Sequence, residues 1–237
     1  MLIFSTFKEP SDITWNSVSS WRFLTSRIIL FGEECRPYEE EFGATILEPE
    51  QKGGLPRIDS MFQQAQEYAD KNEVLIFVNS DILLSPDVLG VAQMVHSQFE
   101  RIGYLIVGQR TNLDVKERLP FAWSGVWNDL RTRTARGHRL PPCGADYFIF
   151  PKGFYENIPP FVIARFSYDN WLIYDALQRK KPVVNATKML LAIHQNHPEA
   201  TALRRCALAS YNQMQATRSH PNWNPWEGWV SHATIKL

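Results

Sequence analysis

Residues 74–84 read Val-Leu-Ile-Phe-Val-Asn-Ser-Asp-Ile-Leu-Leu, an apolar run that is interrupted by three polar residues. A short continuous apolar run without polar alternation is typical of a strand buried on both faces of a parallel sheet. The run is too short to cross a bilayer as a helix, so no transmembrane segment is expected. Ligands of open α/β sheets bind beyond the carboxyl ends of the strands. The polar residues Asn79, Ser80 and Asp81 therefore stand where a ligand is expected.

Apolar runs that predict strands alternate with amphipathic segments along most of the chain. Besides residues 74–78, strands are expected at residues 2–7, 27–31, 45–47, 104–107, 147–150, 183–186 and 190–193. Helices are expected after Ser11 or Asp12 and at residues 56–70, 86–100, 169–177 and 200–215. Strands that alternate with helices, without an internal repeat, predict an α/β protein with an open sheet flanked by helices.

The composition is that of an ordinary globular protein. The 237 residues include 25 Lys and Arg against 25 Asp and Glu, so the formal net charge is zero. Without a net positive charge, nucleic-acid binding is not expected. Cys35, Cys143 and Cys206 form no CxxC pair, and the first residues lack the basic and apolar regions of an export signal. We therefore expect a cytoplasmic protein with reduced thiols.

Asp81 is a carboxylate at the end of a predicted buried strand. Beside a sheet crevice it suits a hard divalent cation, which can bind a diphosphate; the alternative is an acid that forms a tight turn or caps a following helix. Residues 75–82 resemble the strand and DXD motif of the GT-A-fold glycosyltransferases, except that the first acid is Asn79. The resemblance implies that Asp81 binds Mn²⁺ or Mg²⁺, which bridges the phosphates of a nucleotide-sugar donor. It also implies that Asn79 and Ser80 contact the nucleotide.

Two later motifs resemble the same family in the same order. Residues 190–197, Leu-Leu-Ala-Ile-His-Gln-Asn-His, end a predicted strand, and the resemblance implies that His194 or His197 completes the metal site. Residues 166–172, Phe-Ser-Tyr-Asp-Asn-Trp-Leu, resemble the acidic motif of inverting GT-A enzymes, which implies that Asp169 is the catalytic base. The alternatives are a hydrogen-bonded structural histidine and a chemically inert helix N-cap.

Asp146 competes with Asp169 for the role of base. It lies in residues 142–151, a segment that resembles the one after the acceptor loop of these enzymes. Asp146 either binds hydroxyl groups of the sugar or accepts the proton itself. Asp169 matches the base position of the family better, so we assign the base to Asp169.

The nucleotide side of the predicted site draws on the first part of the chain. Thr6 and Lys8 lie at the carboxyl end of the first predicted strand, and Glu33 follows the second. The resemblance places these residues at the base, ribose and phosphates of the nucleotide. Arg57 and Asp59, at the start of a predicted helix, occupy a position where these enzymes often touch the nucleotide. A solvated lysine and an ordinary pair of charges at a helix start are the alternatives.

Between positions 110 and 142 the sequence pattern is irregular, aromatic and basic. These residues suit an acceptor site or, alternatively, buried packing of the aromatic side chains and a solvated helix face for the basic ones. The residues concerned are Phe121, Trp123, Trp127, Arg131, Arg133, Arg136, His138 and Arg139. The tail carries three further tryptophans at positions 223, 226 and 229, which either close over the site or pack on the core.

Taken together, the motifs predict one GT-A-like, Rossmann-like α/β domain with an open mixed sheet. Residues 1–109 would bind the nucleotide sugar, residues 110–199 the acceptor, and residues 200–237 form a helix and tail. The predicted activity is metal-assisted, inverting transfer of a sugar, from a UDP-sugar by preference, to a hydroxyl acceptor. The alternatives are a nucleotidyltransferase and, because Asn79 replaces an acid, a noncatalytic nucleotide- or carbohydrate-binding protein. The sequence does not indicate an oligomeric state.

Overall fold

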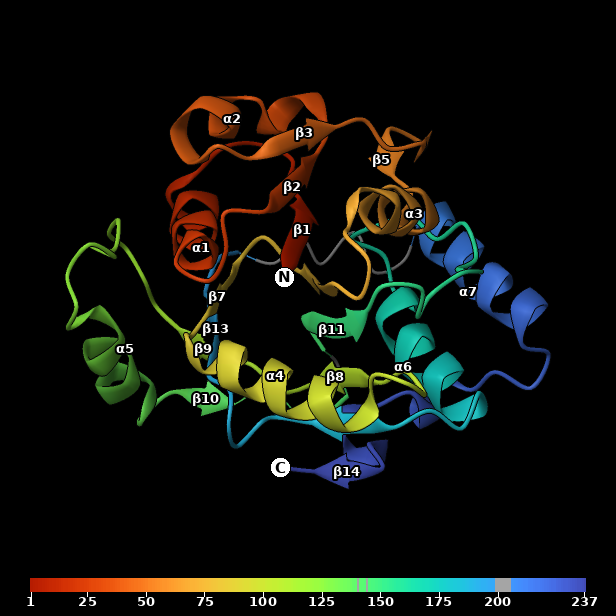
Figure 1. The fold of residues 1–237 in the computed structure, drawn as a ribbon. Helices are drawn as coiled ribbons and strands as arrows, with labels where there is room; N and C mark the ends of the chain where they lie inside the picture. The colour runs from red at the N-terminus through yellow and green to blue at the C-terminus, as the bar shows by residue number, and fades with distance from the viewer. Residues whose placement is uncertain (140, 144, 199–205) are drawn as a thin grey trace.

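The main sheet is built around the predicted buried strand, β6 (Val74–Val78), near its centre (Figure 1). The computed structural model describes residues 1–139, 141–143, 145–198 and 206–237. In spatial order the sheet contains β14 (Ile235–Lys236), β12 (Val183–Asn185), β8 (Leu105–Val107), β11 (Tyr147–Pro151), β6, β1 (Leu2–Thr6), β2 (Ile28–Phe31) and β3 (Thr45–Leu47). β11 runs antiparallel to β6 and β8, whereas the other neighbouring pairs are parallel. The sheet is therefore mixed, as predicted.

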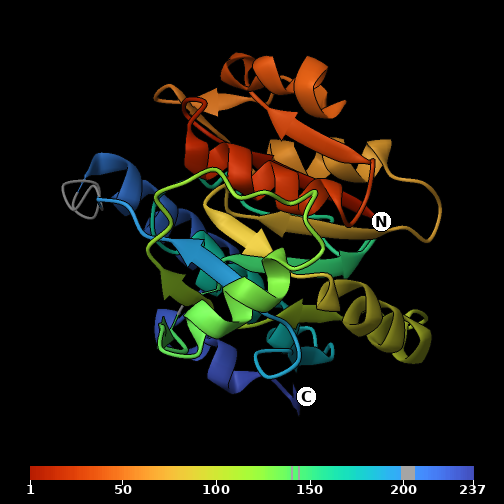
Figure 2. The ribbon, with the colours of Figure 1, turned by 90° about the vertical axis from the view of Figure 1, so that its left-hand side faces the viewer.

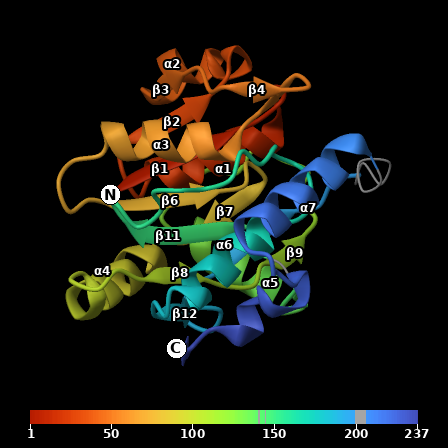
Figure 3. The ribbon, with the colours of Figure 1, turned by 90° about the vertical axis from the view of Figure 1, so that its right-hand side faces the viewer.

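Alternate residues of β6 face two separate parts of the hydrophobic core. Leu75 and Phe77 pack with α3 (Ile58–Tyr68), α6 (Tyr168–Gln178) and α7 (Ala207–Ser219), the helices that face the viewer in Figure 3. Ile76 and Val78 pack with α1 (Asp12–Arg22), α2 (Pro37–Phe42) and α4 (Asp87–Phe99) on the opposite face. Helices on both faces of one mixed sheet confirm the predicted single α/β domain.

A second, smaller sheet forms where the chain leaves β6. It contains β10 (His138–Arg139), β9 (Thr111–Leu113), β13 (Ala192–Gln195) and β7 (Ile82–Leu84) in that order. Figure 2 shows β13 beside β7, with α5 (Val126–Thr134) in front of them. The sequence pattern between residues 110 and 142 predicts no regular structure, but β9, α5 and β10 all lie there. β13 begins and ends two residues later than predicted, so His194 lies within the strand.

Local residues account for the helix starts. The Ser11 hydroxyl accepts the Thr14 backbone N–H at 3.2 Å, so α1 begins where the sequence predicts. The predicted helix at Pro56 begins instead at Ile58, because Pro56 belongs to a hairpin of β4 (Gln51–Lys52) and β5 (Leu55–Pro56). The start of the helix predicted at residues 200–215 lies outside the described residues. None of the described helices is both long and apolar enough to span a bilayer.

Gly108, directly after β8, provides a stability test of this packing. A Cβ atom at Gly108 would lie 1.9 Å from the Oη atom of Tyr147, whose side chain is fully buried. We expect Gly108→Ala to destabilise the fold by about 1–3 kcal/mol, because the tyrosine has no room to move. Gly90→Ala is the matched control: Gly90 is exposed on α4 with nothing within 4 Å of a new Cβ, so alanine should stabilise the protein by up to about 1 kcal/mol. Urea unfolding of both variants measures the difference, and equal midpoints would contradict the packing argument.

Candidate functional site

Asp81 projects from the turn that follows β6. The backbone alone closes this turn, since the Ile82 N–H donates to the Asn79 carbonyl at 3.1 Å. The next element is the strand β7 and not a helix. The Asp81 side chain therefore neither caps a helix nor makes the turn hydrogen bond, which removes the two structural alternatives for this carboxylate.

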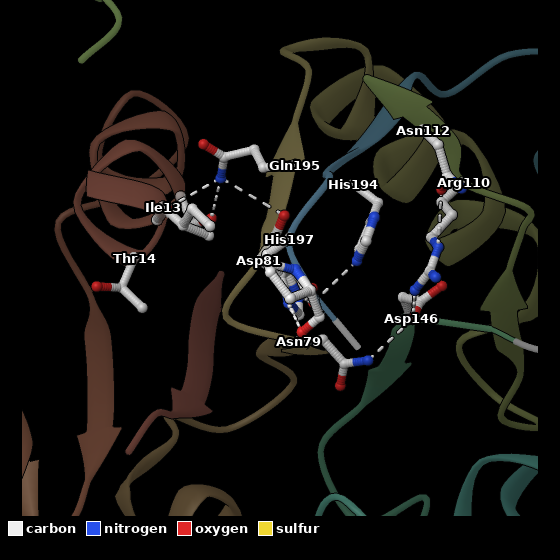
Figure 4. A network of polar contacts seen from close by, with 12 residues as sticks. Ile13, Thr14, Asn79, Asp81, Arg110, Asn112, Asp146, His194, Gln195 and His197 are labelled. Carbon is white, nitrogen blue, oxygen red and sulfur yellow. Dashed lines mark hydrogen bonds and ion pairs between the residues drawn. The ribbon is translucent and has the colours of Figure 1, made fainter. Parts of the chain in front are cut away.

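Two imidazoles meet the Asp81 carboxylate, as Figure 4 shows. His194 lies on β13, opposite Ile82 in the antiparallel pair that β13 forms with β7. Its Nε2 atom is 3.2 Å from Asp81 Oδ2, and the Nε2 atom of His197 is 3.1 Å from the same oxygen. Ligand atoms of all three side chains lie within 4.8 Å of one another. One carboxylate and two imidazoles at this separation form a candidate site for a divalent cation.

The charges of this triad are set by its hydrogen bonds. Burial acts to raise the pKa of Asp81, but the hydrogen bonds from His194 and His197 hold it below its ordinary value. The hydrogen bond with Asp81 raises the pKa of His197. Asp81 Oδ1 and His194 Nδ1 are buried and have no hydrogen-bond partner among the described residues. A buried carboxylate oxygen without a partner is costly unless a ligand satisfies it, so the donor set fits a metal ion.

Gln195 holds the strand of His194 in place. Its side chain is completely buried and donates to the Ile13 carbonyl at 2.9 Å and the Ser17 hydroxyl at 3.0 Å, both on α1. Its backbone N–H donates to the Asp81 carbonyl at 3.1 Å. Gln195, one of the two residues between His194 and His197, thus fixes β13 against both α1 and the turn of Asp81.

Asp146 lies beside the carboxyl end of β6, because it precedes the antiparallel strand β11. Its Oδ1 atom accepts hydrogen bonds from Asn79 Nδ2 at 2.9 Å and from Arg110 Nη1 at 2.7 Å. Asn79 Oδ1 in turn accepts from the Tyr168 hydroxyl at 3.4 Å. Burial raises the pKa of Asp146 even though Arg110 opposes the shift. The structure therefore brings Asp146 and Asn79 together next to Asp81.

Arg110 belongs to this network although the motifs do not point to it. It follows β8, which runs parallel to β6 because the antiparallel strand β11 separates them. The positive charge of Arg110 contributes to lowering the pKa of Asp81. The rule that singles out Asp81, a polar residue after a strand that ends at the same sheet edge, also applies to Arg110.

Asp169 lies in the first turn of α6 and not at its N-cap, which is Ser167. Ser167 has a φ of 92°, a strained conformation for a residue with a side chain. Asp169 Oδ1 is buried, and no described residue hydrogen-bonds to it. Burial raises the pKa of Asp169 to about 6, and the charge of Asp146 adds to the shift. A carboxyl group with this pKa can accept a proton near neutral pH.

The other predicted nucleotide-contacting residues have local partners. The Thr6 hydroxyl donates to the Phe31 carbonyl at 2.7 Å, Glu33 pairs with Arg36, and Arg57 pairs with Asp59 and Glu50. Lys8 is exposed, and Ser80 lies in the turn between Asn79 and Asp81. Within the described residues, no hydrogen bond or ion pair joins Thr6, Lys8, Glu33, Arg57 or Asp59 to the triad.

The basic and aromatic segment predicted as an acceptor site is partly paired and partly packed. Arg131 contacts Asp87 at 2.5 Å and Arg133 contacts Glu117 at 2.9 Å. Phe121 packs against Trp127, whereas Trp123 is 55 % exposed. The ion pairs of Arg131 and Arg133 match the alternative of a solvated, charged helix face.

Comparison with known proteins supports the fold. No family model and no curated protein matches the chain. The solved structure of GalNAc-T7 with UDP, GalNAc and Mn²⁺ is similar at a TM-score of 0.53 and 14% identity, over 91% of this chain and 48% of that one. TarS of S. aureus, residues 1–349, matches 49% of this chain and 38% of its own at a TM-score of 0.37 and 11% identity.

The chain thus has a GT-A-like glycosyltransferase fold, as the sequence motifs predict. It spans about half the length of the GalNAc-T7 chain, since the match covers 48% of that chain. At 14% identity, the similarity to GalNAc-T7 is a similarity of fold, that is, of the arrangement of the sheet and its helices.

Proposed function

We propose that this protein transfers a sugar from a nucleotide-sugar donor, with UDP as the nucleotide, to a hydroxyl group of an acceptor. One observation carries the proposal: the Asp81 carboxylate meets His194 and His197 at the carboxyl end of β6, within a GT-A-like fold. The similar GalNAc-T7 structure was solved with UDP, GalNAc and Mn²⁺, which makes UDP the first nucleotide to test.

Mn²⁺ or Mg²⁺ would be held by Asp81 and by the Nε2 atoms of His194 and His197. The bound ion would offset the negative charge that develops on the departing diphosphate. Asp81 is suited to this role because its lowered pKa keeps it charged, and its buried Oδ1 atom has no hydrogen-bond partner in the part of the chain that the structure describes. His197 must lose its proton to act as a ligand.

Arg110 and Asn79 would support the donor beside the metal site. Both donate to Asp146 Oδ1, so the carboxylate fixes the guanidinium and the amide in one orientation. A guanidinium can bind phosphate oxygens by two parallel hydrogen bonds. We therefore assign Arg110 to the diphosphate, and Asn79 to the nucleotide as the sequence motif implies.

Asp169 would act as the base. Its carboxylate takes the proton of the acceptor hydroxyl while that oxygen attacks the anomeric carbon and the bond from that carbon to the diphosphate breaks. Direct attack inverts the anomeric configuration. Asp169 suits this role better than Asp146, because the Arg110 cation pairs with Asp146 and makes that carboxylate a weaker base.

Calorimetric titration with UDP, GDP and CMP, each with and without Mn²⁺, tests the proposal. We expect UDP to bind in the presence of Mn²⁺ and to bind much more weakly without it. Release of UDP from a UDP-sugar in the presence of an acceptor panel then identifies a transferase. Binding without release across the panel would favour the noncatalytic alternative, and pyrophosphate release from a nucleoside triphosphate would favour a nucleotidyltransferase. Absence of binding by all three nucleotides would overturn the proposal.

A further inference from the structure

Two tryptophans stand side by side on the surface of the C-terminal segment. Trp226 belongs to the 3₁₀ helix η3 (Pro225–Glu227), and Trp229 precedes η4 (Val230–His232). Their ring centroids are 5.5 Å apart with the planes at 64°. Trp226 is 67 % exposed, the largest value among the exposed apolar and aromatic side chains of the described residues. Trp229 is half-buried, so the pair presents one exposed ring supported by a second, partly covered one.

Neighbouring residues fix the position of Trp226 at the surface. Trp223 and Val230, on either side along the chain, are buried in the core cluster that contains α6 and α7. The Asn224 side chain caps η3 by accepting the Trp226 N–H at 3.1 Å, and Pro225 restricts the backbone of the first turn. Trp226 is thus presented by an ordered segment that is anchored at both ends.

The tryptophan pair is attached to the start of α6, where Asp169 lies. The Asn170 side chain donates to the Gly228 carbonyl at 3.1 Å and to the Cys143 carbonyl at 2.9 Å. A Cβ atom at Gly228 would lie 2.0 Å from the Asn170 carbonyl oxygen, so the two backbones touch. Because consecutive Cα atoms are about 3.8 Å apart, the Cα of Trp226 lies at most about 7.6 Å from that of Gly228.

The surroundings of the pair suit a sugar. Glu227 lies between the two tryptophans in sequence, and its Oε1 atom is 3.3 Å from Asn224 Nδ2. A pyranose ring presents an apolar C–H face, which packs on the negative face of an aromatic ring, and hydroxyl groups at its rim, which bond to carboxylate and amide groups. Apolar rings bordered by an acid and an amide offer both kinds of contact.

We propose that Trp226 and Trp229 bind a pyranose residue of a carbohydrate acceptor and hold it beside Asp169. This inference rests on the proposed function, which it extends by naming the acceptor class. Of the two most exposed tryptophans in the described part of the chain, Trp226 and Trp123, we choose Trp226 because its segment is hydrogen-bonded to Asn170, the residue that follows Asp169.

Saturation-transfer NMR with cellobiose, chitobiose and maltose, in the presence of UDP and Mn²⁺, tests the acceptor surface. At least one disaccharide should bind the wild-type protein, and Trp226→Ala should weaken that binding by about tenfold or more. Trp123→Ala tests the competing exposed tryptophan, which the sequence pattern also offers for the acceptor, and it should bind the sugar normally. Tyr68→Ala is the matched control, since it removes a 46 % exposed aromatic ring at the C-terminal end of α3, and it should also bind the sugar normally. No binding by the wild type, equal binding by Trp226→Ala, or loss of binding in Trp123→Ala in place of Trp226→Ala would overturn the inference.

UDP binding in the same samples separates this inference from the proposed function. If UDP binds and no disaccharide does, the acceptor surface is wrong and the transferase proposal stands. If a disaccharide binds through Trp226 and UDP does not bind, the carbohydrate surface stands and the transferase proposal fails. Trp226→Ala should keep the UDP affinity of the wild type, which also shows that the variant is folded.

Discussion

Replacement of Asp169 by asparagine is expected to lower the turnover number of sugar transfer by about 10²- to 10⁴-fold, the usual contribution of a general base. The change keeps the size of the side chain and its place in the first turn of α6 but removes the group that accepts the proton. Binding of UDP with Mn²⁺ should not change, because Asp169 makes no contact with the triad in the described hydrogen bonds. Steady-state kinetics with a UDP-sugar, together with calorimetry, measure both quantities.

The pH profile, measured at Mn²⁺ concentrations that saturate the site at every pH so that protonation of His197 does not limit metal binding, identifies the base independently of the size of the effect. The carboxylate must be ionised to accept a proton, so wild-type turnover should fall as the pH drops below about 6. Asp146→Asn is the informative companion variant, because the charge of Asp146 contributes to raising the pKa of Asp169. The turnover of Asp146→Asn should still fall at acidic pH, but it should begin to fall at a lower pH than that of the wild type. If Asp169→Asn kept wild-type turnover, Asp169 would be excluded as the base. If the fall of turnover at acidic pH disappeared in Asp146→Asn but not in Asp169→Asn, Asp146 would be the base.

The sequence predicts β6 and the location of its polar end because the signal is local. Five apolar residues followed by Asn79, Ser80 and Asp81 contain both the strand and its stop, and the strand has the predicted bounds. The start of α1 is predictable for the same reason, since the Ser11 hydroxyl bonds a backbone N–H only three residues away. These features depend on neighbours in the chain and not on the tertiary structure.

The convergence of the histidines on Asp81 is not a local property. His197 bonds to a carboxylate 116 residues away, through a strand pair whose register no sequence pattern reveals. The predicted assignment of both histidines comes from a family resemblance, and residue spacing alone does not produce it. β9 and β10 contain three and two residues, too few to show alternation, so these two strands of the second sheet have no periodic signal.

The sequence motifs do not identify Arg110, although it follows a strand that ends at the same sheet edge as β6. Recognising it requires the order of the sheet, in which β11 separates β8 from β6 and leaves both ending at the same edge. Arg57 shows the opposite difficulty: its position at a helix start suggests a nucleotide contact, but Asp59 and Glu50 are its partners in the structure. Its assignment to the nucleotide remains a prediction.

Replacement of Asp81 by asparagine is expected to abolish the Mn²⁺ dependence of UDP binding. The asparagine amide keeps the shape of the Asp81 side chain but removes its negative charge. That charge would otherwise offset part of the positive charge of a divalent ion held with two neutral imidazoles. Loss of a residue that only hydrogen-bonds to a metal ligand commonly costs about 10- to 100-fold in metal affinity, so loss of the carboxylate itself should cost about 100-fold or more. Calorimetric titration with UDP and Mn²⁺ measures the change.

Thermal unfolding with and without Mn²⁺ shows whether the effect arises at the triad. A metal that binds the folded state stabilises it by mass action, so Mn²⁺ should raise the melting temperature of the wild type and not that of Asp81→Asn. Asp87→Asn is the matched control, since Asp87 lies further along the chain and pairs with Ser85 and Arg131 outside the triad. It should respond to Mn²⁺ as the wild type does. If Asp81→Asn were still stabilised by Mn²⁺, the ion would bind elsewhere, and the buried Oδ1 atom of Asp81 would lose its explanation as a metal ligand.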